Sequence, residues 1–155
     1  MKIYNFIIKA VSTCFFLGYL PLVPGTFGSL LGLLLFCLIR NNIVVQLGAT
    51  ILITIAGFIV CGRAEELFNR KDPKYIVIDE VAGMLIALLF IPYDFRILII
   101  GFVLFRILDA IKPYPLSGLQ KLKGSLGVMS DDIIAGLYTN ALLQLVLRFS
   151  SFRIS

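Results

Sequence analysis

Two adjacent acidic residues, Asp79 and Glu80, stand at the entrance to an apolar run over residues 81–92. Only nine acidic residues serve the 155 residues of the chain. A carboxylate that lies against hydrocarbon loses its hydration, and this loss is large unless a cation or a hydrogen-bond donor replaces the water. The pair should open a helix, where carboxylates favour the positive end of the macrodipole. We therefore predict that Asp79 and Glu80 have a chemical role and that other polar groups gather around them.

A second set of charged residues recurs at helical spacing. Arg106, Asp109 and Lys112 follow one another at intervals of three residues in an otherwise apolar segment. This spacing predicts one charged stripe along a helix. Charged residues on one side of a membrane helix rarely face lipid, so the stripe is expected to face the interior of a bundle.

A third acidic pair, Asp131 and Asp132, is expected to start the last helix. The small residues Ala135 and Gly136 follow one turn later and would allow another helix to pack closely. Gly83, one turn after Asp79, would similarly let another backbone approach.

Five carboxylates without any histidine or paired cysteine favour a hard cation such as Mg²⁺. Arginine and lysine beside a divalent ion favour a phosphate substrate. The glycine-containing segment 25–29, with Thr26 and Ser29, precedes an apolar run and could offer backbone N–H groups to that phosphate. The sequence thus predicts a magnesium-dependent phosphatase site with Asp79, Glu80, Asp109 and Asp132 as metal ligands, Asp131 as a further catalytic acid, and Thr26, Ser29, Arg106 and Lys112 on the substrate.

Structural explanations remain open for most of these residues taken singly. Asp131 and Asp132 could be ordinary first-turn residues, and Thr26 or Ser29 could be helix caps. Arg106 and Asp109 could form a buried ion pair that ties helices together. What favours a site is that most carboxylates reach the same face of a very apolar protein.

The composition indicates a membrane protein with one domain, residues 1–155. Hydrophobic residues make up 59%, charged residues only 15%, and mean hydropathy is +0.99, far from the balance of soluble proteins. The net charge of +5 suits anionic lipid headgroups, and because the basic residues form no run, nucleic acid is not expected as a partner.

The predicted fold is all-α: a membrane-embedded bundle of about five to six helices, several of them short or half-spanning. The first 20 residues could form an interfacial helix, and residues 116–129 are predicted to be a loop. If each of five apolar segments crosses the membrane, the polar segments that contain the predicted site residues all fall on one face of the membrane. The excess of basic residues there places that face in the cytoplasm. The five apolar segments are residues 27–39, 43–61, 80–92, 95–111 and 132–149.

The absence of histidine excludes a phospho-histidine mechanism and a Ser-His-Asp hydrolase. The three cysteines lie singly in apolar runs and predict neither a disulfide framework nor a zinc site. Of the phosphatase mechanisms considered, the one that remains is attack on a phosphomonoester by a water molecule with help from a metal ion.

Four blocks in this order resemble the phosphatidylglycerophosphatase A family, and they spread over about residues 21–147. They are residues 24–29, Asp72 with residues 76–80 and Gly83, residues 105–109 with Lys112, Pro113 and Pro115, and Asp131–Asp132 with Ala135–Gly136. The family is a bacterial, Mg²⁺-dependent membrane enzyme that removes the terminal phosphate of phosphatidylglycerol phosphate. The resemblance implies an all-helical fold in the inner membrane, with the five acids in a centre on the cytoplasmic side. It also implies roles for Thr26, Ser29, Arg106 and Lys112, while Asp72 and Glu65 are assigned to the periphery.

The first hypothesis is therefore a lipid phosphatase with a phospholipid as its partner; the oligomeric state stays open. A membrane cation or proton transporter that uses the same acids is the alternative, since buried acids also mark ion pathways. That alternative predicts acids spread through the depth of the membrane. An alcohol phosphatidyltransferase ranks lower because its long Asp-Gly…Ala-Arg…Asp…Asp pattern is missing.

Overall fold

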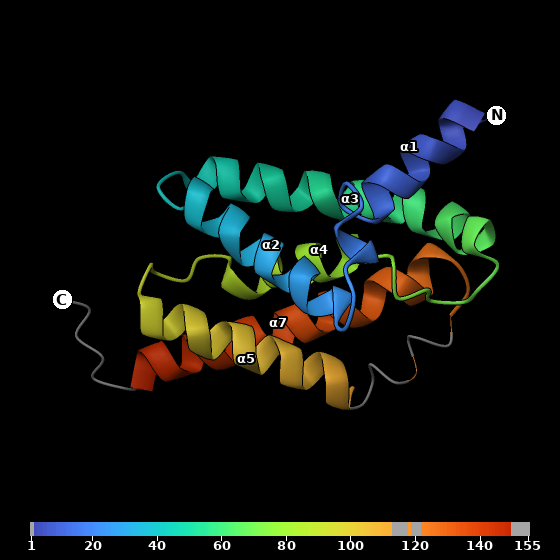
Figure 1. Ribbon diagram of the computed structural model, residues 1–155. Helices are drawn as coiled ribbons and strands as arrows, with labels where there is room; N and C mark the ends of the chain where they lie inside the picture. Colours follow the sequence, from blue (N-terminus) through green and yellow to red (C-terminus); the bar gives the residue numbers. More distant parts are fainter. Residues whose placement is uncertain (1, 113–117, 119–121, 150–155) are drawn as a thin grey trace.

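The computed structural model describes residues 2–112, 118 and 122–149, and within these ranges every element is helical (Figure 1). The prediction of an all-α bundle is thus confirmed. Pro113, Pro115 and part of the predicted loop at residues 116–129 lie outside the described residues. The elements are α1 (Lys2–Ser12), the short 3₁₀ helix η1 (Leu17–Tyr19), α2 (Pro24–Ile39), α3 (Ile43–Phe68), α4 (Ile78–Leu88), α5 (Phe95–Ile111) and α7 (Ser125–Phe149).

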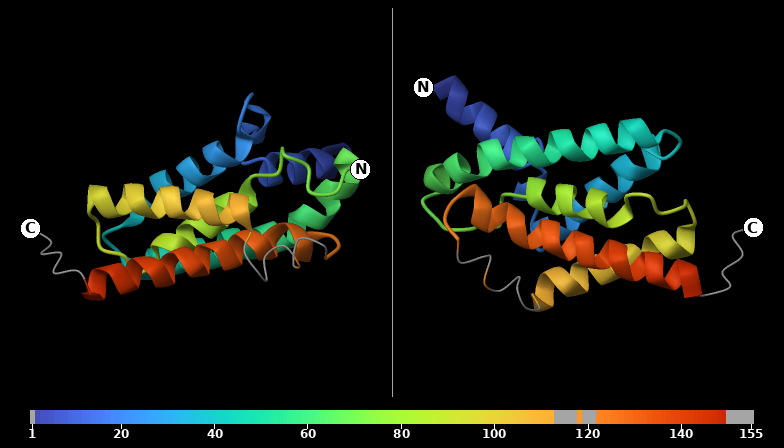
Figure 2. Two further views of the ribbon diagram at one scale, coloured as in Figure 1. Left: turned by 90° about the horizontal axis from the view of Figure 1, so that it is seen from below. Right: turned by 180° about the vertical axis from the view of Figure 1, so that it is seen from behind.

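The short helix α4 forms the centre of the bundle. Figures 1 and 2 show it enclosed by α2 and α3 on one side and by α5 and α7 on the other. Its residues are apolar almost all round, and Val81, Met84, Leu85 and Leu88 are fully buried. A helix that is apolar on nearly all sides can bury its surface only if other helices pack around it. The other helices are therefore organised around α4.

The carboxyl end of α4 lies inside the bundle and is capped by a side chain from α7. The Asn140 amide nitrogen donates to the carbonyl oxygens of Ile86 at 3.2 Å, Ala87 at 3.1 Å and Leu89 at 2.7 Å. These carbonyls belong to the end of α4, where partners within the helix run out, although the Ile86 carbonyl also accepts the Leu89 N–H at 3.2 Å. At 11 residues, α4 is about 16 Å long and too short to cross a ~30 Å hydrocarbon core. It fits the expectation of half-spanning helices.

Glycines set the closest approaches to α4. A Cβ at Gly136 of α7 would lie 2.4 Å from the Gly83 carbonyl oxygen, and one at Gly83 would lie 2.7 Å from the Asp132 carbonyl oxygen. On the opposite side, a Cβ at Gly32 of α2 would lie 2.8 Å from the Met84 Cβ. No real Cβ tolerates such distances, so glycine is required at these crossings. The prediction that Gly83 and Gly136 permit close helix contact is confirmed.

Among the described residues, α3 is the one helix both long and apolar enough to cross a membrane. Helix α2 is apolar but shorter, with 16 residues. The predicted crossings at residues 27–39, 95–111 and 132–149 stay predictions, whereas α4 is too short to complete the one at residues 80–92. Helix α3 extends beyond the predicted segment 43–61 and continues to Phe68, where Asn69, in the left-handed conformation, ends it.

The start of the last helix was also placed incorrectly. Helix α7 begins at Ser125 rather than at Asp132, directly after Gly124, which has a φ of +65°. A contact distant in sequence fixes this start, because the Ser125 hydroxyl accepts a hydrogen bond from the Gly62 N–H at 2.7 Å. Asp131 and Asp132 therefore lie inside a helix, where the first-turn explanation for them does not apply.

The alternating directions of the helices bring the polar segments to one end of the bundle. The starts of α2, α4 and α7 and the ends of α3 and α5 meet there (Figures 1 and 2). At the opposite end, the Arg40 guanidinium stacks 3.7 Å from the centre of the Tyr93 ring. The prediction that the polar islands share one face is confirmed.

Candidate active site

A polar cleft of about 290 Å³ opens at this end of the bundle. Acidic side chains from α4, α5 and α7 and from the segment before α4 share its walls. The cleft is lined by Asp72, Lys74, Ile76, Asp79, Glu80, Asp109, Ala110, Lys112, Asp131 and Asp132. Residues far apart in the sequence, including all five acids predicted for the catalytic centre, thus line one space.

Three carboxylates converge most closely. One oxygen each from Asp79, Glu80 and Asp132 lie within 4.8 Å of one another. Asp79 and Glu80 occupy the first turn of α4, where the Glu80 N–H donates to Asp79 Oδ1 at 3.1 Å. Asp132 reaches them from α7 because Gly83 and Gly136 let the two helix backbones touch.

This cluster is buried and short of partners. Asp79 and Asp132 are each 4% exposed, and Asp132 Oδ1 and Glu80 Oε2 have no hydrogen-bond partner among the described residues. Burial raises the pKa of Asp79 well above its usual range, and the charges of Glu80 and Asp132 raise it further. Buried like charges repel strongly, so the folded chain holds these acids together only at a cost in stability.

Glycine at position 25 makes room for Glu80. A Cβ there would lie 2.3 Å from Glu80 Oε1 and 3.4 Å from Arg106 Nη1. Gly25 belongs to the first turn of α2, since that helix starts at Pro24. The expectation of a phosphate-binding loop before the helix is therefore wrong in its geometry: these residues already form the helix, for which proline at its first position is well suited.

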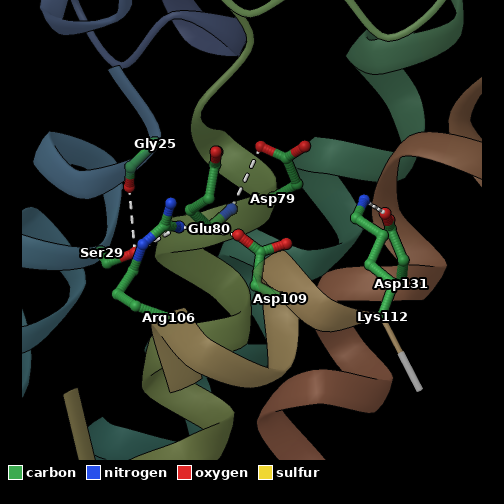
Figure 3. A network of polar contacts seen from close by, with 8 residues as sticks. All are labelled: Gly25, Ser29, Asp79, Glu80, Arg106, Asp109, Lys112 and Asp131. Atoms are coloured by element: carbon green, nitrogen blue, oxygen red, sulfur yellow. Dashed lines mark hydrogen bonds and ion pairs between the residues drawn. The ribbon is translucent and has the colours of Figure 1, made fainter. Parts of the chain in front are cut away.

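Arg106 links α5 to α2 at the edge of the cluster. Its Nη1 donates to Asp109 Oδ2 at 2.8 Å and to the Ser29 hydroxyl at 3.4 Å, and that hydroxyl donates to the Gly25 carbonyl at 3.0 Å (Figure 3). The ion pair with Asp109 lies within one helix, so it does not itself tie helices together. The chain of contacts instead holds the guanidinium beside the acidic centre.

On the other wall, Lys112 pairs with Asp131. The Lys112 ammonium donates to Asp131 Oδ2 and joins the end of α5 to α7 (Figure 3). Lys112 is the C-cap of α5 in the left-handed conformation, with a φ of 48°. Arg106 and Asp109 of the predicted charged stripe therefore lie within the helix, whereas Lys112 lies just after its end. Desolvation raises the pKa of Asp131 even though Lys112 opposes that rise. A cation is thus fixed on each side of the acids: Lys112 lines the cleft, whereas Arg106 and Ser29 lie behind its wall and do not line it.

Comparison with known sequences decides the family. A sequence model described as phosphatidylglycerophosphatase A matches residues 10–147. The chain belongs to the phosphatidylglycerophosphatase A family. The matched range covers all the elements that line the cleft, and the resemblance read from the four blocks is confirmed.

Individual relatives agree with this assignment. The chain is 35% identical over 137 residues to phosphatidylglycerophosphatase A of Escherichia coli K12, covering 83% of this chain and 77% of that protein. It is 32% identical over 125 residues to the protein of that name from Haemophilus influenzae, with 78% and 77% covered. A Bacteroides thetaiotaomicron protein provisionally named phosphatidylinositol-3-phosphatase is 34% identical over 152 residues, with 92% and 95% covered. No solved structure matches.

Membership in the phosphatidylglycerophosphatase A family makes the chain a phosphoric monoester hydrolase. Together with the apolar helix α3, it indicates a membrane protein. The five acids predicted for the catalytic centre gather at one end of the bundle, whereas the transporter alternative predicts acids spread through its depth.

Some predicted residues lie outside the cleft. Thr26 is half-buried in the first turn of α2, and its N–H donates to the Val23 carbonyl at 3.0 Å. Glu65 lines a separate depression beside Arg70 and Lys71, where its carboxylate accepts from the Asp72 N–H at 2.7 Å. Asp72, assigned to the periphery, instead lines the cleft itself.

The sequence reasoning missed Lys74, an exposed cation on the cleft wall. Its only signal in the sequence was a basic residue five positions before Asp79. The role of Gly25 was also missed, because nothing in the sequence shows which side chain its missing Cβ accommodates.

The donor set fits a hard divalent cation. Carboxylate oxygens are the ligands that Mg²⁺ prefers, and two of the three converging acids present a buried oxygen without a partner. Asp109, the fourth predicted ligand, lies on the cleft wall with Arg106 as its partner rather than within the converging group.

Proposed function

We propose that this protein hydrolyses phosphatidylglycerol phosphate to phosphatidylglycerol and phosphate, with Mg²⁺ as its cofactor. Asp79, Glu80 and Asp132 would hold the ion. The observation that supports this most is the convergence of three carboxylates from α4 and α7, two of them buried and that of Glu80 partly buried, at the mouth of an apolar bundle. The family membership supplies the reaction, and the names of the Escherichia coli and Haemophilus influenzae relatives supply the substrate.

When bound, Mg²⁺ supplies a Lewis acid that offsets negative charge on the phosphoryl group. Lys112 and Arg106 lie on opposite sides of the acids, where their cations would bind and orient the phosphate. Bound between them, the headgroup would be held at the cleft while the acyl chains remain in the bilayer.

Asp109 is the acid best placed to handle the attacking water. It lines the cleft but lies outside the converging group, and Arg106 fixes its carboxylate. As the water oxygen forms its bond to phosphorus, Asp109 would accept the proton that the water loses. The phosphorus–oxygen bond to the glycerol headgroup then breaks, and the leaving oxygen takes a proton from solvent.

The reaction would take place at the cytoplasmic face of the bacterial inner membrane. The polar end of the bundle carries the cleft and an excess of basic residues, which the positive-inside bias favours on the cytoplasmic side.

A second lipid phosphate is a specific rival, because the Bacteroides thetaiotaomicron relative is provisionally named a phosphatidylinositol-3-phosphatase. Purified protein in mixed micelles should be given phosphatidylglycerol phosphate or phosphatidylinositol 3-phosphate at matched surface concentration, with Mg²⁺ or with EDTA. We expect faster phosphate release from phosphatidylglycerol phosphate and loss of release in EDTA. A preference for the inositol lipid would show that phosphatidylinositol 3-phosphate is the substrate instead. Equal rates of phosphate release with Mg²⁺ and with EDTA would show that the reaction needs no metal ion.

A further inference from the structure

An apolar groove of about 370 Å³ lies between α2, α3 and α4 and shares no lining residue with the acidic cleft. Its walls come from three helices: Leu31 and Leu35 of α2, Ile53 and Ala56 of α3, and Ile78 and Val81 of α4. Helices α2 and α3 follow one another in the chain but touch only weakly, which leaves this space between them. A cavity lined by hydrocarbon offers water no hydrogen-bond partners, so water is a poor occupant.

The mouth of the groove continues into exposed apolar surface. Leu34 of α2 is 55% exposed beside the groove, and Leu52 of α3, which lines it, is 69% exposed. Leu52 lies in the helix that is apolar and long enough to cross a membrane. The groove is thus an indentation in the surface that a bilayer would cover, and hydrocarbon chains are what that surface meets.

An unusual turn after α1 forms one edge of this mouth. Cys14, Phe15 and Phe16 have consecutive φ values of 48°, 55° and 69°, a left-handed conformation that costs roughly 1–2 kcal/mol per residue. Thr13 holds the turn, since its hydroxyl donates to the Lys9 carbonyl and accepts from the Phe16 N–H. The turn places Phe15 at the groove, where its side chain remains 84% exposed. In a bilayer this side chain would lie against lipid hydrocarbon.

The groove does not communicate directly with the cleft. Gly28 and Gly32 bring α2 against α4, with distances of 2.9 Å from a Cβ at Gly28 to the Val77 carbonyl oxygen and 2.8 Å from one at Gly32 to the Met84 Cβ. This contact is too tight for an acyl chain to pass between the two helices, and the cleft and the groove share no lining residue. The occupant is therefore a chain from a neighbouring lipid and not from the substrate.

We infer that the groove binds one acyl chain of a bilayer phospholipid as a structural ligand of the fold. The chain packs between α2 and α3 and against Ile78 and Val81, which flank Asp79 and Glu80 in the first turn of α4. Phe15 covers it at the mouth. This inference is independent of the proposed phosphatase activity.

The protein contains no tryptophan, so a single introduced tryptophan reports on its own surroundings. Phe15→Trp places the reporter at the groove, and Leu34→Trp places a matched reporter on the neighbouring exposed face of α2. Each variant is reconstituted in vesicles of phosphatidylglycerol and phosphatidylethanolamine with brominated acyl chains, which quench tryptophan on contact. The vesicles are then fused with an excess of unbrominated lipid.

Fluorescence at position 34 should recover as fast as the lipids mix, whereas recovery at position 15 should lag because a retained chain must leave the groove. Filling the groove with Ala56→Leu, or with Leu35→Phe as a second variant, should abolish the lag at position 15. Equal recovery at both positions in the unfilled protein, or a lag that persists in both filled variants, would overturn the inference. The measurement needs no catalysis, so its failure and that of the proposed function are separable.

Discussion

Gly25 and Glu80, in the first turns of α2 and α4, lie against each other, and the space that a Cβ would need at Gly25 is occupied by Glu80 Oε1, 2.3 Å away. The position of one proposed ligand thus depends on the absence of a side chain on another helix. Gly25→Ala should displace the Glu80 carboxylate and lower kcat/KM at least about tenfold, since a shift near 1 Å in a catalytic group has large effects.

Gly48→Ala is the matched control for that substitution. A Cβ at Gly48, in the interior of α3, meets nothing within 4 Å. We expect unchanged kinetics and equal or slightly higher stability, because alanine favours helix over glycine. If phosphate-release assays show the same activity for both alanine variants, the Gly25–Glu80 contact has no catalytic importance.

The crossing of α4 and α7 should be sensitive to any added side chain. Gly136→Ala would bring a Cβ to 2.4 Å from the Gly83 carbonyl, a backbone atom that cannot move aside alone. We expect the helices to separate, with a loss of about 1–3 kcal/mol of stability and a loss of activity as Asp132 moves from Asp79. Gly101→Ala is the milder comparison, because its Cβ would meet only the ends of the Leu143 and Leu88 side chains at 3.0 and 3.1 Å. Thermal unfolding in detergent distinguishes the two.

Asn140 should matter for stability rather than for chemistry. Asn140→Leu removes the donor to the Ala87 and Leu89 carbonyls and one of two donors to the Ile86 carbonyl, and buried acceptors left without partners cost about 1–3 kcal/mol. Gln144→Leu, at an exposed position whose amide donates only to Asn140 among its described contacts, should have a small effect. Similar unfolding midpoints for the two variants would contradict a capping role.

The acidic cluster should lower the stability of the metal-free protein while being required for its activity. Burial raises the folded-state pKa of Asp79 above its unfolded value, so in the metal-free protein the folded state binds more protons than the unfolded state. Stability without metal should therefore rise as pH falls from neutral. Asp79→Asn should raise the unfolding midpoint of the metal-free protein at pH 7, flatten this pH dependence and abolish activity. A lower midpoint for this variant at pH 7 would show that the charge is already compensated within the fold.

Much of this fold could be predicted because the chemistry of individual residues restricts it strongly. The five acids Asp79, Glu80, Asp109, Asp131 and Asp132 were expected to gather at one end of an apolar chain, and Gly83 and Gly136 indicated a close crossing before their partners were known. The start of α7 could not be predicted, because it depends on the Ser125–Gly62 hydrogen bond, between residues 63 positions apart. The partition of the acids was equally hidden: only coordinates show that Asp132 joins Asp79 and Glu80 while Asp109 and Asp131 pair with cations.

The location of a bound divalent ion tests the account most directly. Crystals of the purified protein grown with Mn²⁺ in place of Mg²⁺ should be measured at the manganese absorption edge, with Asp132→Asn as the comparison. We predict an anomalous peak in the wild-type cleft at about 2.0–2.3 Å from oxygens of Asp79, Glu80 and Asp132, and its loss in the variant. An empty cleft at saturating Mn²⁺, or a peak only beside Glu65 and Glu66, would contradict the proposed metal centre.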